Sequence, residues 1–327
     1  MKDVSAGGAV VNTVLGPVPA RELGVVAVHE ALLSVVPGAE YAYDVTIDRA
    51  EIFEILAAKL REFRECGGGT IVDATGMFHG RDVRLYETLS RATGVHIVAS
   101  TGMGPEEMLG GYFLTPQTNP PTPWPADKFA GLFGEEVTEG MVVPRVERRG
   151  AAGLVATTAT RAGMTATDES LFRGAARAAN VSGVPVSVRF GADAVRDLAV
   201  LLDERLPADR VVVGGLDRKD AVAAAAPLEI ARRGAYVAVD NIGTEGDEFV
   251  TDDERATLIR DLVDAGFADR ILLSANVIGV AKGGPGRDLP YSHVLTAFVP
   301  LLTAQGLSVR DVRRILTDNP RELLSVR

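Results

Sequence analysis

The sequence predicts a single α/β domain, a (β/α)8 or TIM barrel, with a short β-hairpin before its first strand. Eight short apolar segments recur along the 327 residues, and segments with helical spacing of apolar residues separate them. Alternating strands and helices build a parallel sheet, and eight such units close a barrel of about 250 residues before insertions. A doubly wound sheet is the alternative, but no glycine-rich phosphate-binding motif follows the first strand.

The elements follow one another in a regular order. Residues 1–23 contain a β-prone run and a Gly16-Pro17 turn, which predict the hairpin. The first barrel strand is expected within 24–32, and the helix within 46–65 has its apolar residues on one stripe. The other seven strands are expected at 70–74, 95–99, 154–157, 184–189, 211–214, 236–240 and 271–274.

Two later helices have a predictable beginning. Thr251 and Glu254 have the spacing of a capping box, in which each residue satisfies a backbone N–H group of the other. Thr165 and Asp168 form a weaker version of the same pattern. We therefore expect helices to begin directly after Thr251 and Thr165.

Two longer loops interrupt the pattern and are expected at the barrel mouth, where strands end. Residues 102–126 are rich in Gly, Pro and Thr and contain Tyr112 and Trp124. A loop of this length is usually functional or disordered, and its aromatic residues favour a lid or pocket wall. Residues 279–290 form the second loop, which carries Lys282. Together with the hairpin, these loops complete one domain over 1–327.

Composition and charge limit the partners. The net charge of −10 is spread along the chain without a basic block, which argues against nucleic acid as a partner. The single cysteine, Cys66, excludes an intramolecular disulfide and suits a reducing compartment. No signal-peptide pattern or membrane-spanning apolar segment is present. We expect a cytoplasmic protein with a small-molecule partner and no membrane partner.

The first strand predicts where the chemistry lies. Its apolar run ends in His29 and Glu30, and alternation along a strand would place Ala27, His29 and Ala31 on one face. Active sites of (β/α)8 barrels lie at the carboxyl ends of the strands. His29 is thus a candidate base, and the alternative is a core histidine bonded to the next strand. Asp240, at the end of strand seven, could orient it.

Ten short segments spread over nearly the whole chain point to a known family: 13–17, 28–30, 72–75, 80–82, 99–102, 175–178, 183–186, 231–236, 269–274 and 318–320. On these segments the chain resembles the phosphotriesterase family of the amidohydrolase superfamily. The resemblance implies the barrel fold and a homodimer, the common form in the family. It also implies two divalent metals, held by a His-x-His pair on strand one, a carboxylated lysine on strand four, histidines on strands five and six and an aspartate on strand eight.

Carried over position by position, only His29 among these ligands is retained. Zinc and similar ions need three or four His, Cys or carboxylate ligands. An arginine in a ligand position adds a permanent positive charge, and two positive charges about 4 Å apart repel by several kcal/mol at an effective dielectric near 20. We therefore expect no metal and no cofactor. The residues at the other positions are Ala31, Leu154, Arg189, Gly215 and Asn276.

The leading hypothesis is a metal-independent enzyme that uses acid–base chemistry on a carbonyl-bearing small molecule. His29 would move the proton, while Arg189 and Asn276 would hold an oxyanion or an acidic group. The reaction would be an isomerisation, a cyclisation, an elimination or the opening of a lactone or ester, in bacterial specialised metabolism. Further substrate contacts are expected from Glu30, Thr101, Tyr112, Trp124 and Lys282.

Two alternatives stay open at this point. The first is a non-catalytic pseudoenzyme that binds a ligand or a partner subunit, which suits the replacement of ligands by Leu, Ala and Gly. In that case we expect Leu154 and Arg189 to fill the mouth, whereas an open mouth with converging polar groups favours an enzyme. The second is a hydrolase that keeps one metal on His29 and a carboxylate. The role of Arg189 also has two interpretations: it binds an anionic group of the substrate, or it forms a salt bridge with Glu30 or Asp240.

Overall fold

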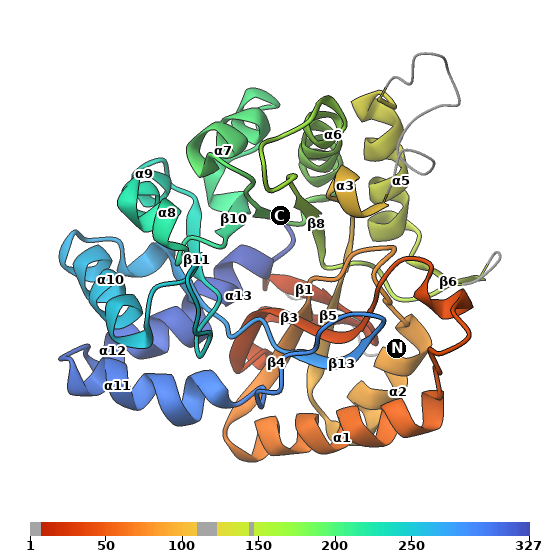
Figure 1. The fold of residues 1–327 in the computed structure, drawn as a ribbon, viewed down its shortest axis with the longest axis horizontal. Helices are drawn as coiled ribbons and strands as arrows, with labels where there is room; N and C mark the ends of the chain where they lie inside the picture. Colours follow the sequence, from red (N-terminus) through yellow and green to blue (C-terminus); the bar gives the residue numbers. More distant parts are fainter. Residues whose placement is uncertain (1–7, 110–122, 144–146) are drawn as a thin grey trace.

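The computed structural model describes residues 8–109, 123–143 and 147–327, and Figure 1 shows helices surrounding a ring of strands. The predicted (β/α)8 barrel is confirmed. Nine strand segments form one parallel sheet, with each segment hydrogen-bonded to the next. Their order is β12 (Ile271–Leu273), β11 (Tyr236–Val239), β10 (Val211–Gly214), β9 (Val186–Arg189), β8 (Leu154–Thr158), β5 (His96–Thr101), β4 (Gly68–Asp73), β3 (Val25–Val35) and β13 (Ile278–Lys282).

Strand eight of the barrel is divided into two segments, β12 and β13. Segment β12 pairs with β11, and β13 pairs with β3 in a register that runs from Ile278↔Ala31 to Lys282↔Val35. The expectation of a loop throughout 279–290 is therefore wrong in its first part. Gly279 obscured the strand in the sequence, and it is needed there because a Cβ would lie 2.8 Å from the Leu32 carbonyl oxygen.

The N-terminal hairpin is also present. Strands β1 (Val10–Thr13) and β2 (Gly16–Pro19) are antiparallel. The turn between them is at Val14 and Leu15, so the prediction of a Gly16-Pro17 turn is wrong by two residues: Gly16 pairs with Thr13 and Pro17 with Asn12 within the hairpin. A second, very short antiparallel pair is formed by β6 (Val142–Val143) and β7 (Glu147–Arg148).

Both predicted capping boxes are formed. Thr165 and Asp168 begin α6, and Thr251 and Glu254 begin α10. The first helix begins after Asp48, whose carboxylate accepts the backbone N–H groups of Ala50 and Glu51. The α-helices are α1 (Arg49–Glu65), α2 (Val83–Thr93), α3 (Glu106–Leu109), α5 (Ala126–Thr138), α6 (Ala166–Ser182), α7 (Ala194–Asp203), α8 (Lys219–Ala223), α9 (Ala226–Arg232), α10 (Asp252–Asp264), α11 (Val299–Ala304), α12 (Val309–Arg313) and α13 (Asn319–Leu324).

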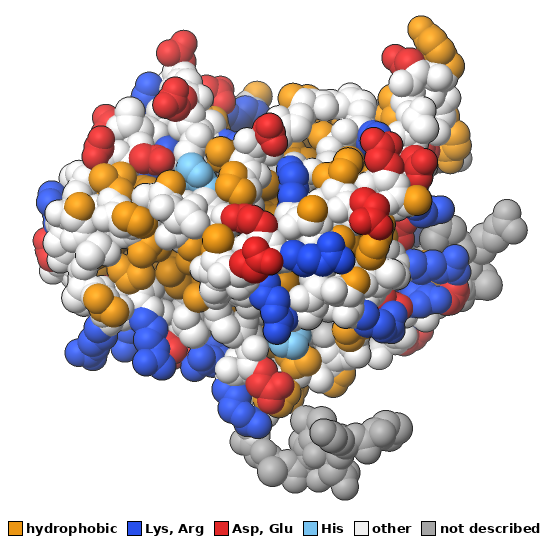
Figure 2. Space-filling view, turned by 90° about the horizontal axis from the view of Figure 1, so that it is seen from below, with side chains coloured by type: hydrophobic (Ala, Val, Ile, Leu, Met, Phe, Trp, Pro, Cys, Tyr) orange, Lys and Arg blue, Asp and Glu red, His pale blue; other side chains and the backbone are white. Residues whose placement is uncertain are grey.

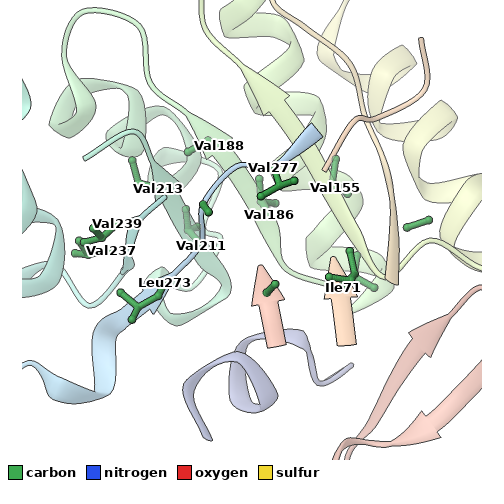
Figure 3. Packing of buried hydrophobic residues seen from close by; sticks show 14 of the residues in the cluster. Ile71, Val155, Val186, Val188, Val211, Val213, Val237, Val239, Leu273 and Val277 are labelled. Carbon is green, nitrogen blue, oxygen red and sulfur yellow. The ribbon is translucent and has the colours of Figure 1, made fainter. Parts of the chain in front are cut away.

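The apolar core has two layers. The inner layer fills the barrel with side chains such as Val28, Val212 and Leu272. The outer layer lies between strands and helices, and Figure 3 shows part of it, with residues such as Ile71 on β4 and Val213 on β10. Burial of both faces explains why these parallel strands read as continuous apolar runs in the sequence.

Strand β3 contains one extra residue just before the barrel mouth. Its register with β4 passes from Ala27↔Ile71 to Glu30↔Asp73, so β3 advances three residues where β4 advances two. A bulge of this kind changes the face to which the following side chains point. The predicted shared face is therefore wrong for Ala27, which packs in the outer layer, whereas His29 and Ala31 line the mouth.

The surface carries charges of both signs. On the face shown in Figure 2, basic and acidic side chains are interspersed. No helix among the described residues is long and apolar enough to cross a membrane.

Candidate active site

A cavity of about 280 Å³ opens at the carboxyl ends of the barrel strands. Its wall is formed by the ends of β3, β8, β9 and β10 and by the loops that follow β4, β5 and β12. Polar side chains from β3, β8 and β9 and from the connection after β12 line this space, which is the usual place for function in a (β/α)8 barrel. They include His29, Glu30, Ser187, Arg189 and Asn276.

His29 is held between two side chains that come from other strands. Its Nδ1 lies 2.9 Å from Oδ2 of Asp240, and its Nε2 lies 2.8 Å from Oγ of Ser187. Only 5% of the His29 side chain is exposed, and that part faces the cavity. The imidazole thus connects a buried carboxylate with a hydroxyl in the cavity wall.

Asp240 is the fully buried acceptor at the centre of this group. Its Oδ1 accepts the backbone N–H of Gly215 at 2.8 Å and the amide of Asn241 at 3.0 Å. Its Oδ2 accepts Arg189 Nη2 at 3.0 Å in addition to His29. Burial alone would raise the pKa of Asp240, but the Arg189 guanidinium and the His29 ring hold that pKa well below its usual range. At neutral pH Asp240 is therefore a carboxylate and can only accept hydrogen bonds, so Nδ1 of His29 carries the proton that is donated to it.

Arg189 and Ser187 stand two residues apart on β9 and point to the same side. Side chains at i and i+2 of a strand share a face, so both reach the cavity while Val186 and Val188 pack under the helices. Arg189 pairs with Asp240 rather than Glu30, and its side chain is still 37% exposed. Sequence reasoning missed Ser187, although its position relative to Arg189 in the predicted strand was a usable signal.

Glu30 serves mainly to close the barrel. It is 2% exposed and accepts the Ser274 hydroxyl at 2.7 Å and the Ala275 N–H at 3.2 Å, together with the Val277 N–H. These bonds attach the connection between β12 and β13 to β3. Asn276 lies in the same connection with a left-handed backbone (φ 49°) and lines the cavity, and its contact with an oxyanion stays a prediction.

Other predicted substrate contacts do not meet at this cavity. Thr101 is fully buried at the end of β5, and Lys282 lies at the far end of β13; neither lines the cavity wall. Trp124 packs against Phe129, with ring centroids 6.0 Å apart, and under the Lys128 ammonium group, so it anchors the beginning of α5. The expectation that Trp124 covers the site is wrong for this reason. Tyr112 lies outside the described residues.

Leu154 is also not part of the mouth. It is at the first position of β8 and packs inside the barrel with Val98 and Val212, whereas Ala156, two residues further along β8, lines the cavity. Leu154 therefore does not fill the mouth in the way that would favour the pseudoenzyme alternative. Within residues 8–109, 123–143 and 147–327, no group of three or more His, Cys, Asp and Glu side chains is arranged to hold a metal ion.

The fold and the cavity define this chain as a TIM-barrel protein with a polar site at the carboxyl ends of its strands. More particularly, the chain belongs to the phosphotriesterase family, whose sequence model matches residues 9–324.

Individual relatives match over almost their full length. The chain is 26% identical to the phosphotriesterase homology protein of Escherichia coli K12, over 91% of this chain and 97% of that protein. A variant of the organophosphorus hydrolase from Deinococcus radiodurans is 25% identical, with a TM-score of 0.85 over 98% of this chain and 99% of the other. A variant of a phosphotriesterase-like lactonase from the same organism is 26% identical, with a TM-score of 0.83 over 96% and 100%.

We predict that Glu30 makes the protein less stable as the pH rises from about 5 to 7. Burial raises the pKa of Glu30 from 4.5 to about 7, so in this range the folded state binds more protons than the unfolded state. Stability then falls with rising pH, by about 3 kcal/mol in total for a shift of this size. Urea unfolding at several pH values should show this fall in the native protein and a flatter profile in Glu30→Gln.

The difference between the two pH profiles gives the contribution of Glu30 to the free energy of unfolding. Burial also raises the pKa values of Asp73 and Asp197, but both residues are present in the native protein and in the variant. Parallel profiles for the two proteins would mean that Glu30 is ionised in the folded state throughout this range.

Proposed function

We propose that this chain is a metal-independent enzyme that uses His29 to move protons on a small carbonyl compound bound at the barrel mouth. The observation that carries the proposal is the position of His29 in the cavity wall, with Nδ1 on the buried Asp240 carboxylate. This contact leaves the lone pair of Nε2 on the side of the cavity, where a general base is needed. Asp240 also stabilises the imidazolium that forms when His29 accepts a proton.

Two further groups suit a carbonyl substrate. Arg189 places a cationic donor in the cavity wall, and Asn276 adds an amide group there. Donors of this kind stabilise the negative charge that develops on a carbonyl oxygen during enolisation or nucleophilic attack. The cavity of about 280 Å³ suits a small molecule, because ligand pockets usually measure about 300–1,000 Å³. The lactonase among the relatives agrees with ring opening as the reaction.

The donor groups at the mouth support a mechanism without the two metals that the family implies. Both ring nitrogens of His29 are engaged by Asp240 and Ser187, and Asp240 is also paired with Arg189. A divalent ion would have to displace a guanidinium from the only carboxylate that touches His29 in the described part of the chain. Ala31, Ala156 and Gly214 offer no side-chain donor to the cavity. These residues do not fit a binuclear centre, and no step of the proposed reaction passes through one.

The second candidate is a pseudoenzyme that binds a ligand without turning it over. One observation favours it: the charged groups of the mouth are already paired with one another, as in the Arg189–Asp240 bridge of 3.0 Å. For either candidate we propose a small-molecule ligand, a cytoplasmic protein and a homodimer.

We predict turnover that is independent of added metal and dependent on His29. The full chain, purified without chelator, is assayed on a panel of aryl esters and lactones of different ring size, before and after EDTA and with added zinc, while metal content is measured. We expect less than one metal ion per chain and unchanged rates. His29→Gln should lower the rate about a thousand-fold or more, because the base is lost.

The matched control is His96→Gln. His96 begins β5 at the opposite end of the barrel, so this variant should keep the native rate. Stoichiometric metal with loss of rate in EDTA would contradict metal independence. Absence of turnover on the whole panel would favour the pseudoenzyme.

A further inference from the structure

We infer that Ser187 is a nucleophile and that this barrel hydrolyses carboxylic esters and lactones through a covalent acyl-enzyme. The inference rests on the proposed function, because it uses His29 as the base. Its basis is the order of three groups across one ring: Ser187 Oγ is 2.8 Å from His29 Nε2, and His29 Nδ1 is 2.9 Å from Asp240 Oδ2. A hydroxyl, an imidazole and a buried carboxylate in this order form a catalytic triad, which is defined by geometry and not by fold.

The direction of the hydrogen bonds suits a nucleophilic serine. Asp240 is ionised and only accepts, so Nδ1 of His29 donates to it and Nε2 carries the lone pair. The Ser187 hydroxyl therefore donates to Nε2, which is the arrangement that removes its proton during attack. Ser187 is 6% exposed, and that exposed part faces the cavity.

Arg189 is positioned to stabilise the oxyanion. It lies two residues after Ser187 on β9 and on the same face, so a carbonyl carbon at Ser187 would hold its oxygen in the region of the guanidinium. Among the described residues, Asp240 engages only Nη2 of Arg189, which leaves further N–H donors of the guanidinium for a substrate oxygen. Asn276 lines the same cavity and offers a neutral donor.

The chemical steps balance with water as the only co-reactant. Ser187 Oγ forms a bond to the carbonyl carbon while its proton passes to His29 Nε2, and the π electrons move to the carbonyl oxygen. When the carbonyl re-forms, the bond to the alkoxy oxygen breaks, and that oxygen takes the proton from Nε2. Water then attacks the acyl group, gives a proton to His29, and releases the carboxylic acid as the proton returns to Ser187. In a lactone the alcohol stays attached to the acyl group.

The test is covalent labelling of the full chain. A fluorophosphonate probe should place one phosphonyl group per chain on Ser187, located by peptide mass spectrometry. With p-nitrophenyl acetate, an initial burst of about one p-nitrophenol per chain and an acetylated Ser187 in acid-quenched samples are expected. Ser187→Ala should abolish the label and the burst and lower turnover about a thousand-fold. The serine control is Ser182→Ala at the end of α6, which should be labelled and turn over like the native protein.

The outcomes separate this inference from the proposed function. Turnover that survives in Ser187→Ala but is lost in His29→Gln would overturn the nucleophile and leave the proton carrier in place. Native turnover without labelling or acylation of Ser187 would do the same. Should Ser187→Ala fail to fold, the site of labelling in the native protein decides, and Ser187→Cys, which keeps a nucleophile, should still form an acyl-enzyme.

Discussion

Asp240→Asn is expected to lower the rate of ester or lactone turnover about 10,000-fold, as loss of the orienting carboxylate does in other triads. The reason is the tautomer of His29. A carboxylate accepts the Nδ1 proton, whereas an asparagine that keeps its oxygen on the Gly215 N–H turns its NH₂ group toward His29. Nδ1 must then accept, the proton moves to Nε2, and His29 no longer removes a proton in the cavity. Steady-state rates at neutral pH measure this effect.

A glycine variant tests the geometry of the Asp240–His29 contact without removing the Asp240 charge. Gly214→Ala keeps every charge, but its Cβ would lie 2.6 Å from Asp240 Oδ2 and 3.1 Å from the His29 ring, so the pair must shift. We expect a loss of about a hundred-fold, the usual cost of a 1 Å misplacement. The control is Gly131→Ala at an exposed position of α5, where the added Cβ meets no atom within 4 Å, so this variant should keep the native rate. An Asp240→Asn enzyme with near-native turnover would remove Asp240 from the mechanism.

Arg255→Met is expected to lower the free energy of unfolding by about 3–5 kcal/mol. Arg255 is fully buried in α10, and its Nε lies 2.8 Å from Oδ2 of the equally buried Asp217. Removal of the guanidinium leaves Asp217 as an uncompensated charge in the interior, and burial already raises the pKa of this carboxyl. Urea unfolding measures the loss. The double variant with Asp217→Asn should regain part of it, because the buried charge is then absent.

An exposed pair provides the control for this prediction. Glu229 in α9 and Arg233, the residue that caps its C-terminal end, form an i,i+4 bridge with about two fifths of each side chain exposed. Arg233→Met should therefore cost less than about 1 kcal/mol. Equal losses from both arginine variants would show that the Arg255 pair is well screened. The Arg255 variant should also lower turnover, because Asn241 donates its amide to both Asp217, at 2.7 Å, and Asp240, at 3.0 Å.

Much of the architecture could be read from local patterns. The strands, the N-terminal hairpin and the capping boxes at Thr165 and Thr251 depend on residues close together in the chain, and they are present near the predicted positions. The hairpin turn, however, is at residues 14–15, and strand eight has a second segment, β13. The errors have a different origin. The bulge in β3 and the pairing of β13 depend on the neighbouring strands, and the position of Trp124 depends on packing against α5.

The sequence by itself determined which chemical groups stand at the ends of the strands: an imidazole at 29, a guanidinium at 189 and a carboxylate at 240. Only the tertiary structure decided their partners. Ser187 and Asp240 are 158 and 211 residues from His29 in the chain, and closure of the barrel brings all three within hydrogen-bond distance. Local residue preferences fix strands and helix ends, but a contact of a few ångströms depends on strand register and on the extra residue in β3.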